Sequence, residues 1–554
     1  MIKEQFSLVE YLIQRLYVEG IEDIVISPGS RNAPIIEALV CFNKFKLHSI
    51  IDERSAAFFA LGCTIQSKKP SVLLCTSGSA VLNYLPAISE AFYQGRSLIV
   101  ISADRPESFV GQMAGQTIHQ QNSLGSFVKS FQQLSSKDEL RFIKRKIEDG
   151  IASMNKGLNG PIHFNIPFEE PFYGHKYKFN HEVKKVEIYN SVNPLDKEVE
   201  VLKASWDKAS KIIILVGCLD KNKELNSCLN ELSKDERLVI LCEATSNLTI
   251  ENSFVSIDNL VTQIDNIENT SSYEPDLLIT LGRNVVSKKI KALLSRSNIK
   301  EHWSFDEEEH MIDTYGHLSH KISYSPASIL SKLKTQEKGY YNKSFQKLEN
   351  HSREIQTEYL KNLDLCDYKA FDVIFRQIPK DSVVHLANSS VIRYANLFDL
   401  RSKDIICYAN RGTSGIDGST STAVGYSRKS DKLNILITGD ISFLYDSNAL
   451  WNNDFPDNLR IIVINNGGGG IFDIVPGAKD SPVKEEFLKC ENNWSDFQNL
   501  FGFDLLSITS ITEMKKVNLF LNSEKLIFEI DSSGAKNEEL LTSYNKGLSF
   551  KSNM

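Results

Sequence analysis

Short apolar runs alternate with segments of helical period along most of the chain. Continuous apolar runs separated by helices are typical of parallel strands that helices cover on both faces. The sequence therefore predicts an α/β fold of three doubly wound units with parallel sheets. The predicted strands are residues 21–27, 46–51, 71–77, 97–102 and 161–167 in the first unit, 211–217, 237–243 and 276–282 in the second, and 381–388, 404–410, 433–439, 459–465 and 525–530 in the third.

Changes in polarity separate these units. Residues 172 to about 200 are polar and rich in lysine, and we interpret them as a linker. Residues 335–365 are highly charged with a helical period, which predicts a solvated connecting helix. The predicted domains are therefore residues 1–180, 181–345 and 346–554.

The N-terminus, MIKEQFSLVEYLIQRL, is amphipathic and carries Glu4 and Glu10. This pattern predicts a surface helix and not a signal peptide. No stretch approaches the roughly 18 apolar residues that span a bilayer, so we expect no association with a membrane. Nine scattered cysteines without a CxxC pair predict small core residues in a reduced, cytoplasmic protein.

Composition narrows the class further. The chain has 554 residues, of which 42% are hydrophobic and 24% are charged. These values are those of a globular protein and exclude global disorder. Its 63 Lys+Arg and 70 Asp+Glu give a net charge of −7, without the basic excess that binds nucleic acid.

Polar side chains follow two predicted strands of the third unit. Asp440 follows LNILITG and Asn466 follows LRIIVIN, 26 residues later, which is the length of one βαβ repeat. In open α/β sheets ligands bind beyond the carboxyl ends of the strands. A carboxylate, an amide oxygen and a glycine backbone carbonyl are hard oxygen ligands that suit Mg²⁺ or Ca²⁺, and a helix beginning near Ser442 offers N–H groups to phosphate. The pattern predicts a metal-diphosphate site.

The glycine run 467–470 differs from a dinucleotide fingerprint. It lacks the third glycine of GxGxxG at its usual spacing, and no acidic residue ends a strand about 20 residues later. We therefore do not expect a nicotinamide cofactor. In the first unit Glu53 lies where a predicted strand ends and a helix of small residues begins. It is either a carboxylate favoured by the helix dipole or a buried ligand for a ring nitrogen, and the residues alone leave both open.

These residues resemble a known family. Gly439-Asp440 with Asn465-Asn466 resembles the GDG and NN signature of thiamine-diphosphate-dependent enzymes, and Glu53 resembles the glutamate of their pyrimidine-binding domain. The three units resemble their pyrimidine, middle and pyrophosphate domains. Further segments, all in the two outer units, resemble the branch of this family that works in menaquinone biosynthesis: residues 27–34 (SPGSRNAP), 52–56 (DERSA), 76–80 (TSGSA), 103–106 (ADRP) and 410–418 (NRGTSGIDG).

The resemblance implies a transferase that uses thiamine diphosphate with Mg²⁺ or Mn²⁺. It implies decarboxylation of 2-oxoglutarate and conjugate addition of the resulting succinyl-semialdehyde carbanion to isochorismate, with release of CO₂. Glu53 would share a proton with the aminopyrimidine of the cofactor, a task that suits a partly buried carboxyl group of raised pKa. Ile416 would support the bent cofactor. The implied metal ligands are Asp440, Asn466 and Gly468, and the other implied cofactor contacts are Ser389, Gly439, Ile441 and Ser442.

Both implied substrates are dicarboxylates, which the planar fork of arginine binds through two hydrogen bonds. Four arginines lie in or beside strand-end loops and match the family pattern: Arg31, Arg105, Arg393 and Arg411. The resemblance adds Ser30, Gln116 and Ser389 as hydrogen-bonding candidates. Ile471 and Phe472 are candidates for an apolar wall, although core packing would explain them equally well.

The chain departs from the family pattern in places. Asn465-Asn466-Gly467-Gly468 is one residue shorter than the common NNNGG, so Asn465 remains an alternative to Asn466 as the amide ligand. Ile441 replaces the last glycine of GDG but agrees with the GDLS of the menaquinone branch. Lys288 and Lys289 lie near a basic pair of the family, and we interpret them as solvated charges.

Two other functions compete with this hypothesis. An acetolactate-synthase-like or decarboxylase-like enzyme would act on a smaller 2-oxo acid and need fewer carboxylate-binding arginines. A non-catalytic relative would bind the cofactor without turning over a substrate. The joint presence of Glu53, Asp440, Asn466 and the four arginines disfavours both. The resemblance also implies an active site between subunits, in a homodimer or homotetramer.

Overall fold

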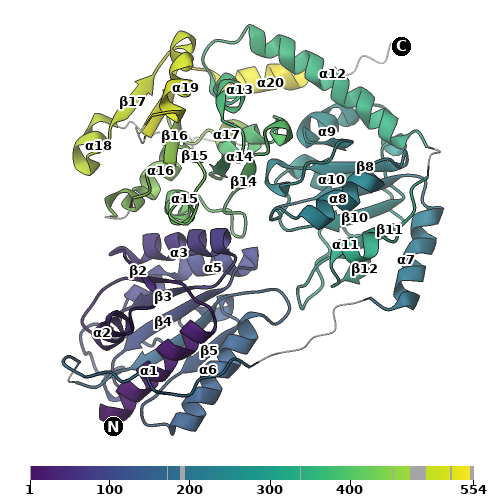
Figure 1. Cartoon of the computed structure of the whole chain (residues 1–554). Coiled ribbons are helices and arrows are strands. Elements are labelled where there is room, and N and C mark those ends of the chain that lie inside the picture. The colour runs from purple at the N-terminus through teal and green to yellow at the C-terminus, as the bar shows by residue number, and fades with distance from the viewer. Residues whose placement is uncertain are drawn as a thin grey trace. The chain divides into compact units, whose positions relative to one another are not determined.

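The computed structural model describes residues 2–170, 172–186, 194–336, 339–452, 455–474, 494–523 and 527–548. It contains three six-stranded parallel sheets with helices packed against them (Figure 1), which confirms the predicted α/β class. One sheet lies in each third of the chain. Every strand predicted from an apolar run is present, shortened by one to four residues at its ends in most cases.

The first and third sheets have the same strand order. In the first sheet it is β2(Lys46–Ser49), β1(Asp23–Ile26), β3(Ser71–Cys75), β4(Leu98–Asp104), β6(Ile162–Pro167) and β5(Ser130–Gln133). In the third it is β14(Ile406–Tyr408), β13(Val383–Leu386), β15(Asn434–Gly439), β16(Leu459–Asn465), β18(Ile527–Asp531) and β17(Leu505–Ile508). In both sheets the second strand lies on one side of the first, and the third strand lies on the other side. This reversal of the strand order is a switch point, and ligands bind at such points in open sheets.

The middle sheet has the order of a dinucleotide-binding fold, 3-2-1-4-5-6 in chain sequence. Its strands are β9(Ser253–Phe254), β8(Leu238–Cys242), β7(Ile212–Val216), β10(Leu277–Leu281), β11(Glu301–Phe305) and β12(Leu318–Ile322). The pattern of apolar runs missed β5, β9, β11, β12 and β17. All but β11 are edge strands, and sequences such as SFQQ in β5 and LSHKI in β12 are too polar to stand out, because an edge strand is covered less fully.

Helices connect the strands throughout. They are α1(Ile2–Val18), α2(Ala33–Phe42), α3(Glu53–Ser67), α4(Ala80–Asn83), α5(Leu85–Gln94), α6(Leu140–Met154), α7(Asp196–Lys208), α8(Lys223–Leu232), α9(Ile257–Asp265), α10(Lys288–Arg296), α11(Pro326–Leu330), α12(Tyr341–Lys361), α13(Asp367–Gln377), α14(Ser390–Ala395), α15(Ser419–Ser427), α16(Asp440–Tyr445), α17(Ile471–Ile474), α18(Trp494–Phe501), α19(Lys516–Leu521) and α20(Asn537–Gly547). The helix predicted near Ser442 therefore begins two residues earlier, at Asp440.

Two helices of the first unit touch backbone to backbone. Every residue of α3 from Ser55 to Ile65 is buried, and so is every residue of α15. A Cβ atom added at Gly62 would lie 2.1 Å from the carbonyl oxygen of Thr422, and one at Gly425 would lie 2.0 Å from that of Phe59. A helix that is apolar on all sides has to be buried on all sides, and glycine is what allows this close approach.

The N-terminal helix is present as α1, but its surface character was predicted wrongly. Glu10 and Arg15 are buried, with 8% and 1% of their surface exposed. Arg15 is held by an ion pair of 2.7 Å to Glu148 on α6. Long charged side chains can be buried when they are paired, and the sequence does not reveal the partner.

The segment predicted as a linker also packs on α1 in its first part. The ring of His175 stacks on Phe6 at 4.0 Å, and the backbone N–H of Lys178 donates to Glu10 at 2.6 Å. Tyr177 and Phe179 lie against the core of the first sheet. Residues 172–183 are therefore part of the first unit, and residues 187–193 lie outside the described residues.

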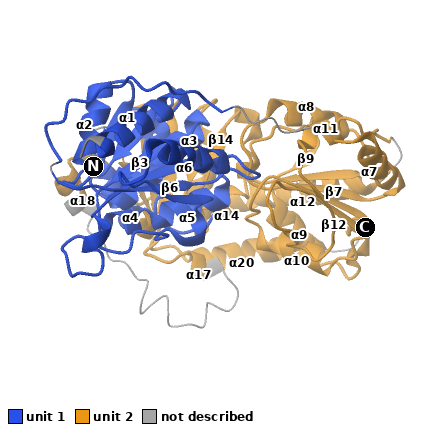
Figure 2. Ribbon diagram, turned by 90° about the horizontal axis from the view of Figure 1, so that it is seen from below, with its two compact units in different colours: residues 1–189, 410–431, 443–459 blue, residues 190–409, 432–442, 460–554 orange. Residues whose placement is uncertain are grey.

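The predicted connecting helix is α12, and one of its faces is not solvated. Phe345 and Leu348 belong to the core beneath the middle sheet. By its contacts the chain divides into two compact units (Figure 2). The first consists of residues 1–189, 410–431 and 443–459, and the second of residues 190–409, 432–442 and 460–554. The second unit thus contains both the middle and the third sheet.

Candidate active site

Predicted site residues flank the switch points of the first and third sheets. In the first sheet the loop after β1 carries Ser30 and Arg31. In the third, Ser389 follows β13 and Asp440 follows β15. The candidates divide between the compact units: Ser30, Arg31, Glu53, Arg105, Gln116, Arg411 and Ile416 lie in the first, and Ser389, Arg393, Gly439, Asp440, Ile441, Ser442, Asn466, Gly468, Ile471 and Phe472 in the second.

The loops after β15 and β16 meet at Asp440. One carboxylate oxygen accepts a hydrogen bond from Ile441 N–H at 2.8 Å, and the other accepts one from Gly468 N–H at 2.8 Å. Gly467, Gly468 and Gly469 all have positive φ angles, which explains why the turn consists of glycine. The two segments that the sequence predicted to meet beyond neighbouring strands therefore do so.

Asp440 has the surroundings of a cation ligand. Only 3% of its surface is exposed, and burial raises the pKa of its carboxyl group, while hydrogen bonds from Ile441 and Gly468 lower it in part. Among the described residues no cationic side chain forms an ion pair with Asp440. A buried carboxylate without such a partner is costly, and a divalent cation compensates that cost. Gly439 leaves open space beside the same strand end, since an added Cβ atom would meet no described atom within 4 Å. These residues fit a metal-diphosphate group.

The structure distinguishes the two asparagines. The side-chain oxygen of Asn465 accepts from Gly467 N–H at 3.2 Å, and its NH₂ group donates to Glu529 at 2.7 Å. The NH₂ group of Asn466 donates to Asp367 at 2.9 Å. Within the described part of the chain, the side-chain oxygen of Asn466 accepts no hydrogen bond. This oxygen is therefore the more available ligand, which favours Asn466 over Asn465.

Glu53 is the first residue of α3. Asp52 caps this helix by accepting from Ser55 N–H at 3.1 Å, and Asn448 donates to the other oxygen of Asp52. Glu53 is half-buried, and desolvation raises the pKa of its carboxyl group, with a smaller contribution from the charge of Asp52. A raised pKa is what a proton-sharing carboxyl group requires.

A buried hydrogen-bonded chain holds the start of α3. The hydroxyl groups of Ser55 and Ser421 lie 2.9 Å apart, and Ser421 donates its N–H and its hydroxyl to Asp446, each at 2.7 Å. Asp446 is fully buried, and burial raises its pKa to about 7, although Arg54 lowers it in part. Nothing in the sequence indicated Asp446, because an acidic residue after a short helix usually faces solvent.

Substitution of Asp446 by asparagine should change the pH dependence of stability. Burial raises the pKa of Asp446 in the folded state, so the contribution of this group to stability is greatest below about pH 4 and is lost as the pH rises through about 7. The variant lacks this loss, and we expect the difference in unfolding free energy to shift in its favour by about 4 kcal/mol between pH 3 and pH 8. Urea unfolding at both pH values measures it, and parallel pH curves would contradict it.

Two of the predicted arginines lie near each other in the first unit. The guanidinium of Arg31 is 4% exposed, donates to the carbonyl of Phe168 at 3.1 Å and lies 4.2 Å from the ring of Phe172. Burial and then the charge of Arg105 lower the pKa of Arg31. Two neighbouring guanidinium groups repel each other, and an anion beside them offsets this repulsion. The carboxylate of Glu170, 4.0 Å from Arg31, offsets part of it.

The backbone beside these arginines is strained at Gln116. This residue has a φ angle of 52°, and its carbonyl accepts from the hydroxyl of Ser77 at 2.9 Å. Gln120 fixes the facing loop by accepting from Gly78 N–H at 2.9 Å. Non-glycine residues held at positive φ are concentrated at functional sites. Ser30 lies exposed in the loop after β1.

A buried carboxylate holds the loop that carries Arg411. Glu90 on α5 accepts from Gly412 N–H and from both the N–H and the hydroxyl of Thr413, each at 2.6 Å. Glu90 is 1% exposed. No sequence pattern indicated Glu90, which lies in an ordinary amphipathic helix. Ile416 is half-buried further along the same loop.

The remaining candidates lie in the second unit. Ser389 has a φ angle of 70° directly before α14, which carries Arg393. Ile471 and Phe472 begin α17 and are half-buried, and the N–H of Phe472 donates to Gly469 at 2.9 Å. Partial exposure beside the glycine turn fits the predicted apolar wall better than core packing. Lys289 donates to Thr262, so it is not a purely solvated charge.

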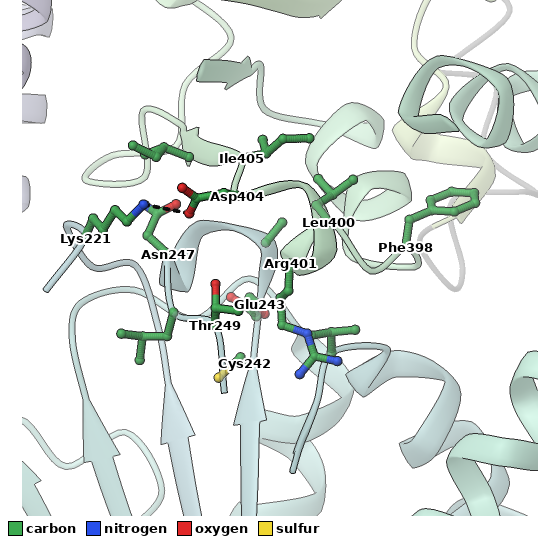
Figure 3. A pocket seen from close by; sticks show the side chains of 14 residues that line it. Lys221, Cys242, Glu243, Asn247, Thr249, Phe398, Leu400, Arg401, Asp404 and Ile405 are labelled. Carbon is green, nitrogen blue, oxygen red and sulfur yellow. Dashed lines mark hydrogen bonds and ion pairs between the residues drawn. The ribbon is translucent and has the colours of Figure 1, made fainter. Parts of the chain in front are cut away.

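A cavity in the second unit contains none of these candidates (Figure 3). It comprises about 490 Å³ of empty space, part of it open to solvent. Its charged residues are engaged by the protein: Lys221 pairs with Asp404 at 2.6 Å, Glu243 accepts from two backbone N–H groups, and Arg401 donates to two backbone carbonyls. The lining joins the middle sheet to the third sheet, and these charged side chains are occupied by contacts within the protein.

Comparison with known proteins identifies the family. Residues 6–124 match the family described as thiamine pyrophosphate enzyme, N-terminal TPP binding domain. The 2-succinyl-5-enolpyruvyl-6-hydroxy-3-cyclohexene-1-carboxylate synthase of Flavobacterium psychrophilum is 38% identical over 99% of this chain and 100% of its own length. The chain belongs to this synthase family. The synthases of Flavobacterium johnsoniae (38% identical, 99% of this chain and 100% of the relative) and Porphyromonas gingivalis (32%, 97% and 96%) agree.

The similarity to these synthases extends over the middle sheet as well as the outer sheets. The sequence motifs lie only in the two outer units. Among the described residues, no helix is both long and apolar enough to cross a membrane. Nor do those residues contain a group of three or more His, Cys, Asp or Glu side chains that could hold a metal ion. The predicted metal set is of a different kind, because it combines one carboxylate with an amide and a carbonyl.

Proposed function

We propose that this protein joins 2-oxoglutarate to isochorismate with loss of CO₂ and forms 2-succinyl-5-enolpyruvyl-6-hydroxy-3-cyclohexene-1-carboxylate, a step of menaquinone biosynthesis. The observation that carries the proposal is the identity of 38% over the whole chain to a synthase of that name. The loops at the switch points of the outer sheets support it, because they bear the charged groups that a diphosphate cofactor and two dicarboxylates require.

The proposed cofactor is thiamine diphosphate with Mg²⁺ or Mn²⁺. When bound, it supplies the electron sink that decarboxylation of a 2-oxo acid needs. Asp440, Asn466 and the carbonyl of Gly468 are the proposed metal ligands, and Ser389, Gly439, Ile441 and Ser442 the proposed contacts to the remainder of the cofactor. Glu53 would hold a proton on its carboxyl group and share it with the aminopyrimidine nitrogen.

The proposed substrate contacts are basic and apolar. Arg31, Arg105, Arg393 and Arg411 would bind carboxylates, and Ser30, Gln116 and Ser389 would add hydrogen bonds. Ile471 and Phe472 would exclude water beside the reacting carbon, and Ile416 would support the cofactor. The positive charges of Arg31 and Arg105 lie close enough in the first unit to affect each other. Two such charges favour a dicarboxylate over a small 2-oxo acid such as pyruvate.

We further propose that residues 1–180, 181–345 and 346–554 serve as pyrimidine, middle and pyrophosphate domains. Each range contains one complete sheet. The active form is proposed to be a cytoplasmic homodimer or homotetramer, in which the first domain of one chain faces the third domain of another. Light scattering on fully active enzyme tests this, and a monomeric mass would refute it.

The function is tested by a single turnover of 2-oxoglutarate with thiamine diphosphate and Mg²⁺, with and without isochorismate. We expect CO₂ from 2-oxoglutarate but not from pyruvate, and an adduct only when isochorismate is present. A preference for pyruvate would favour the acetolactate-synthase-like alternative and refute the arginine roles. Cofactor binding without consumption of either acid would identify a non-catalytic relative.

A further inference from the structure

The side chain of Asp367 lies next to the glycine turn of the third sheet. Asp367 is the first residue of α13 and is 1% exposed. One of its carboxylate oxygens accepts from the hydroxyl of Ser532 at 2.5 Å, and the other accepts from the NH₂ group of Asn466 at 2.9 Å. Its backbone N–H donates to the side-chain oxygen of Asn537 at 2.8 Å. Two hydrogen bonds to the carboxylate and one from the backbone N–H therefore fix this residue.

The chemistry of these contacts determines which end of the Asn466 amide faces Asp367. An ionised carboxylate only accepts hydrogen bonds, so the NH₂ group must point toward it. The amide is planar, and its oxygen then points to the other side, where no described residue donates to it. Without such an acceptor the amide can rotate and present its NH₂ group to a cation, which repels it.

The neighbouring Asn465 is also oriented by a buried carboxylate, but its amide oxygen already accepts a hydrogen bond. The NH₂ group of Asn465 donates to Glu529, which is 4% exposed and also accepts from the hydroxyl of Ser507. In this case the amide oxygen is used within the turn by Gly467 N–H. Two buried carboxylates, one per asparagine, thus orient the two amides, and only that of Asn466 keeps a usable oxygen.

We propose that Asp367 is a positioning residue that orients the amide oxygen of Asn466 toward the metal. The inference rests on the proposed metal site and assigns a residue that supports it. Groups that orient a metal ligand typically contribute 10- to 100-fold to metal affinity. Asp367 would thus act through Asn466 and not by touching the metal.

The experiment measures Mn²⁺ binding in the presence of saturating thiamine diphosphate and without substrate. The free ion is quantified by electron paramagnetic resonance, so turnover is not needed. We expect Asp367→Ala to weaken Mn²⁺ binding by about 10- to 100-fold. Asp367→Asn should recover part of the loss, because its amide oxygen still accepts from Asn466. Glu529→Ala is the matched control, and we expect it to change the affinity by less than about 3-fold, since it orients the other asparagine.

A double variant separates positioning from a general structural role. In the background of Asn466→Ala, Asp367→Ala should weaken Mn²⁺ binding by no more than about 2-fold further, because its target is gone. An equal loss in both backgrounds would overturn the inference, and so would an unchanged affinity in Asp367→Ala. Should Asp367→Ala fail to fold in metal-free thermal unfolding, Asp367→Asn decides the same comparison.

The outcome for Asn466→Ala distinguishes the role of Asp367 from the proposed metal site on which it rests. If this variant binds Mn²⁺ as tightly as the wild type, the proposed metal site is wrong. If it loses affinity while both Asp367 variants keep theirs, the metal site stands and the role of Asp367 is refuted.

Discussion

Substitution of Glu53 by glutamine is expected to lower kcat by about 1,000-fold, within the range that one acid-base group contributes. Glutamine keeps the size of the side chain and its place at the start of α3, but it cannot release or accept a proton at neutral pH. Desolvation raises the pKa of Glu53, so its surroundings favour the protonated form more than water does. CO₂ release from 2-oxoglutarate in the presence of isochorismate measures the effect.

Binding of the cofactor should survive this change. We expect the dissociation constant of thiamine diphosphate with Mg²⁺, measured by calorimetry, to change by less than about 10-fold, since one hydrogen bond at most is altered. Asp52→Asn is the control. It removes a neighbouring charge from the same helix start and keeps a residue that caps helices, so activity should fall far less. Equal activity of Glu53→Gln and wild type would refute the role of Glu53.

Substitution of Asp440 by asparagine should have the opposite signature, with cofactor binding lost first. Asp440 is the one carboxylate of the proposed metal set, and its removal leaves the cation with neutral ligands. We expect the affinity for thiamine diphosphate with Mg²⁺ to fall by about 100-fold or more. This loss exceeds the 10- to 100-fold loss that is typical when a residue that only orients a metal ligand is removed. Quenching of tryptophan fluorescence during titration measures it.

The matched control for this variant is Asp531→Asn. Asp531 is the last residue of β18 in the third sheet, but its carboxylate accepts from the N–H of Ser533 in its own turn. We expect the control to keep cofactor affinity within about 3-fold of wild type. A similar loss in both variants would show that the effect of Asp440 is on the sheet edge as a whole and not on a metal.

The sequence predicted those parts of the fold that depend on continuous apolar runs. Central strands such as β7 and β8 are buried on both faces, so their residues are uniformly apolar and easily recognised. The edge strands β5 and β12 escaped because fewer atoms cover them. The buried charges of α1 escaped for another reason. The partner of Arg15 is 133 residues away, and no local pattern encodes that pairing.

The residues of the candidate site also divide into those that a local sequence pattern predicts and those that it does not. Asp440, Asn466 and Glu53 follow strands, where the fold class alone predicts ligand-binding loops. The supporting carboxylates lie in helices with ordinary sequences: that of Asp367 contacts Asn466, and that of Glu90 holds the loop of Arg411. Their contacts connect segments 99 and 322 residues apart. Such supporting residues become visible only when the distant segments are brought together.

The close contact between α3 and α15 has a consequence for synthesis of the chain. The apolar helix α3 is complete by residue 67, but α15, which covers it, begins only at residue 419. Residues 443–459 of the same compact unit follow later still. During translation α3 must therefore remain without its cover while more than half of the protein is made. A nascent chain halted before residue 419 should expose this helix to chaperones, and one released after residue 459 should not.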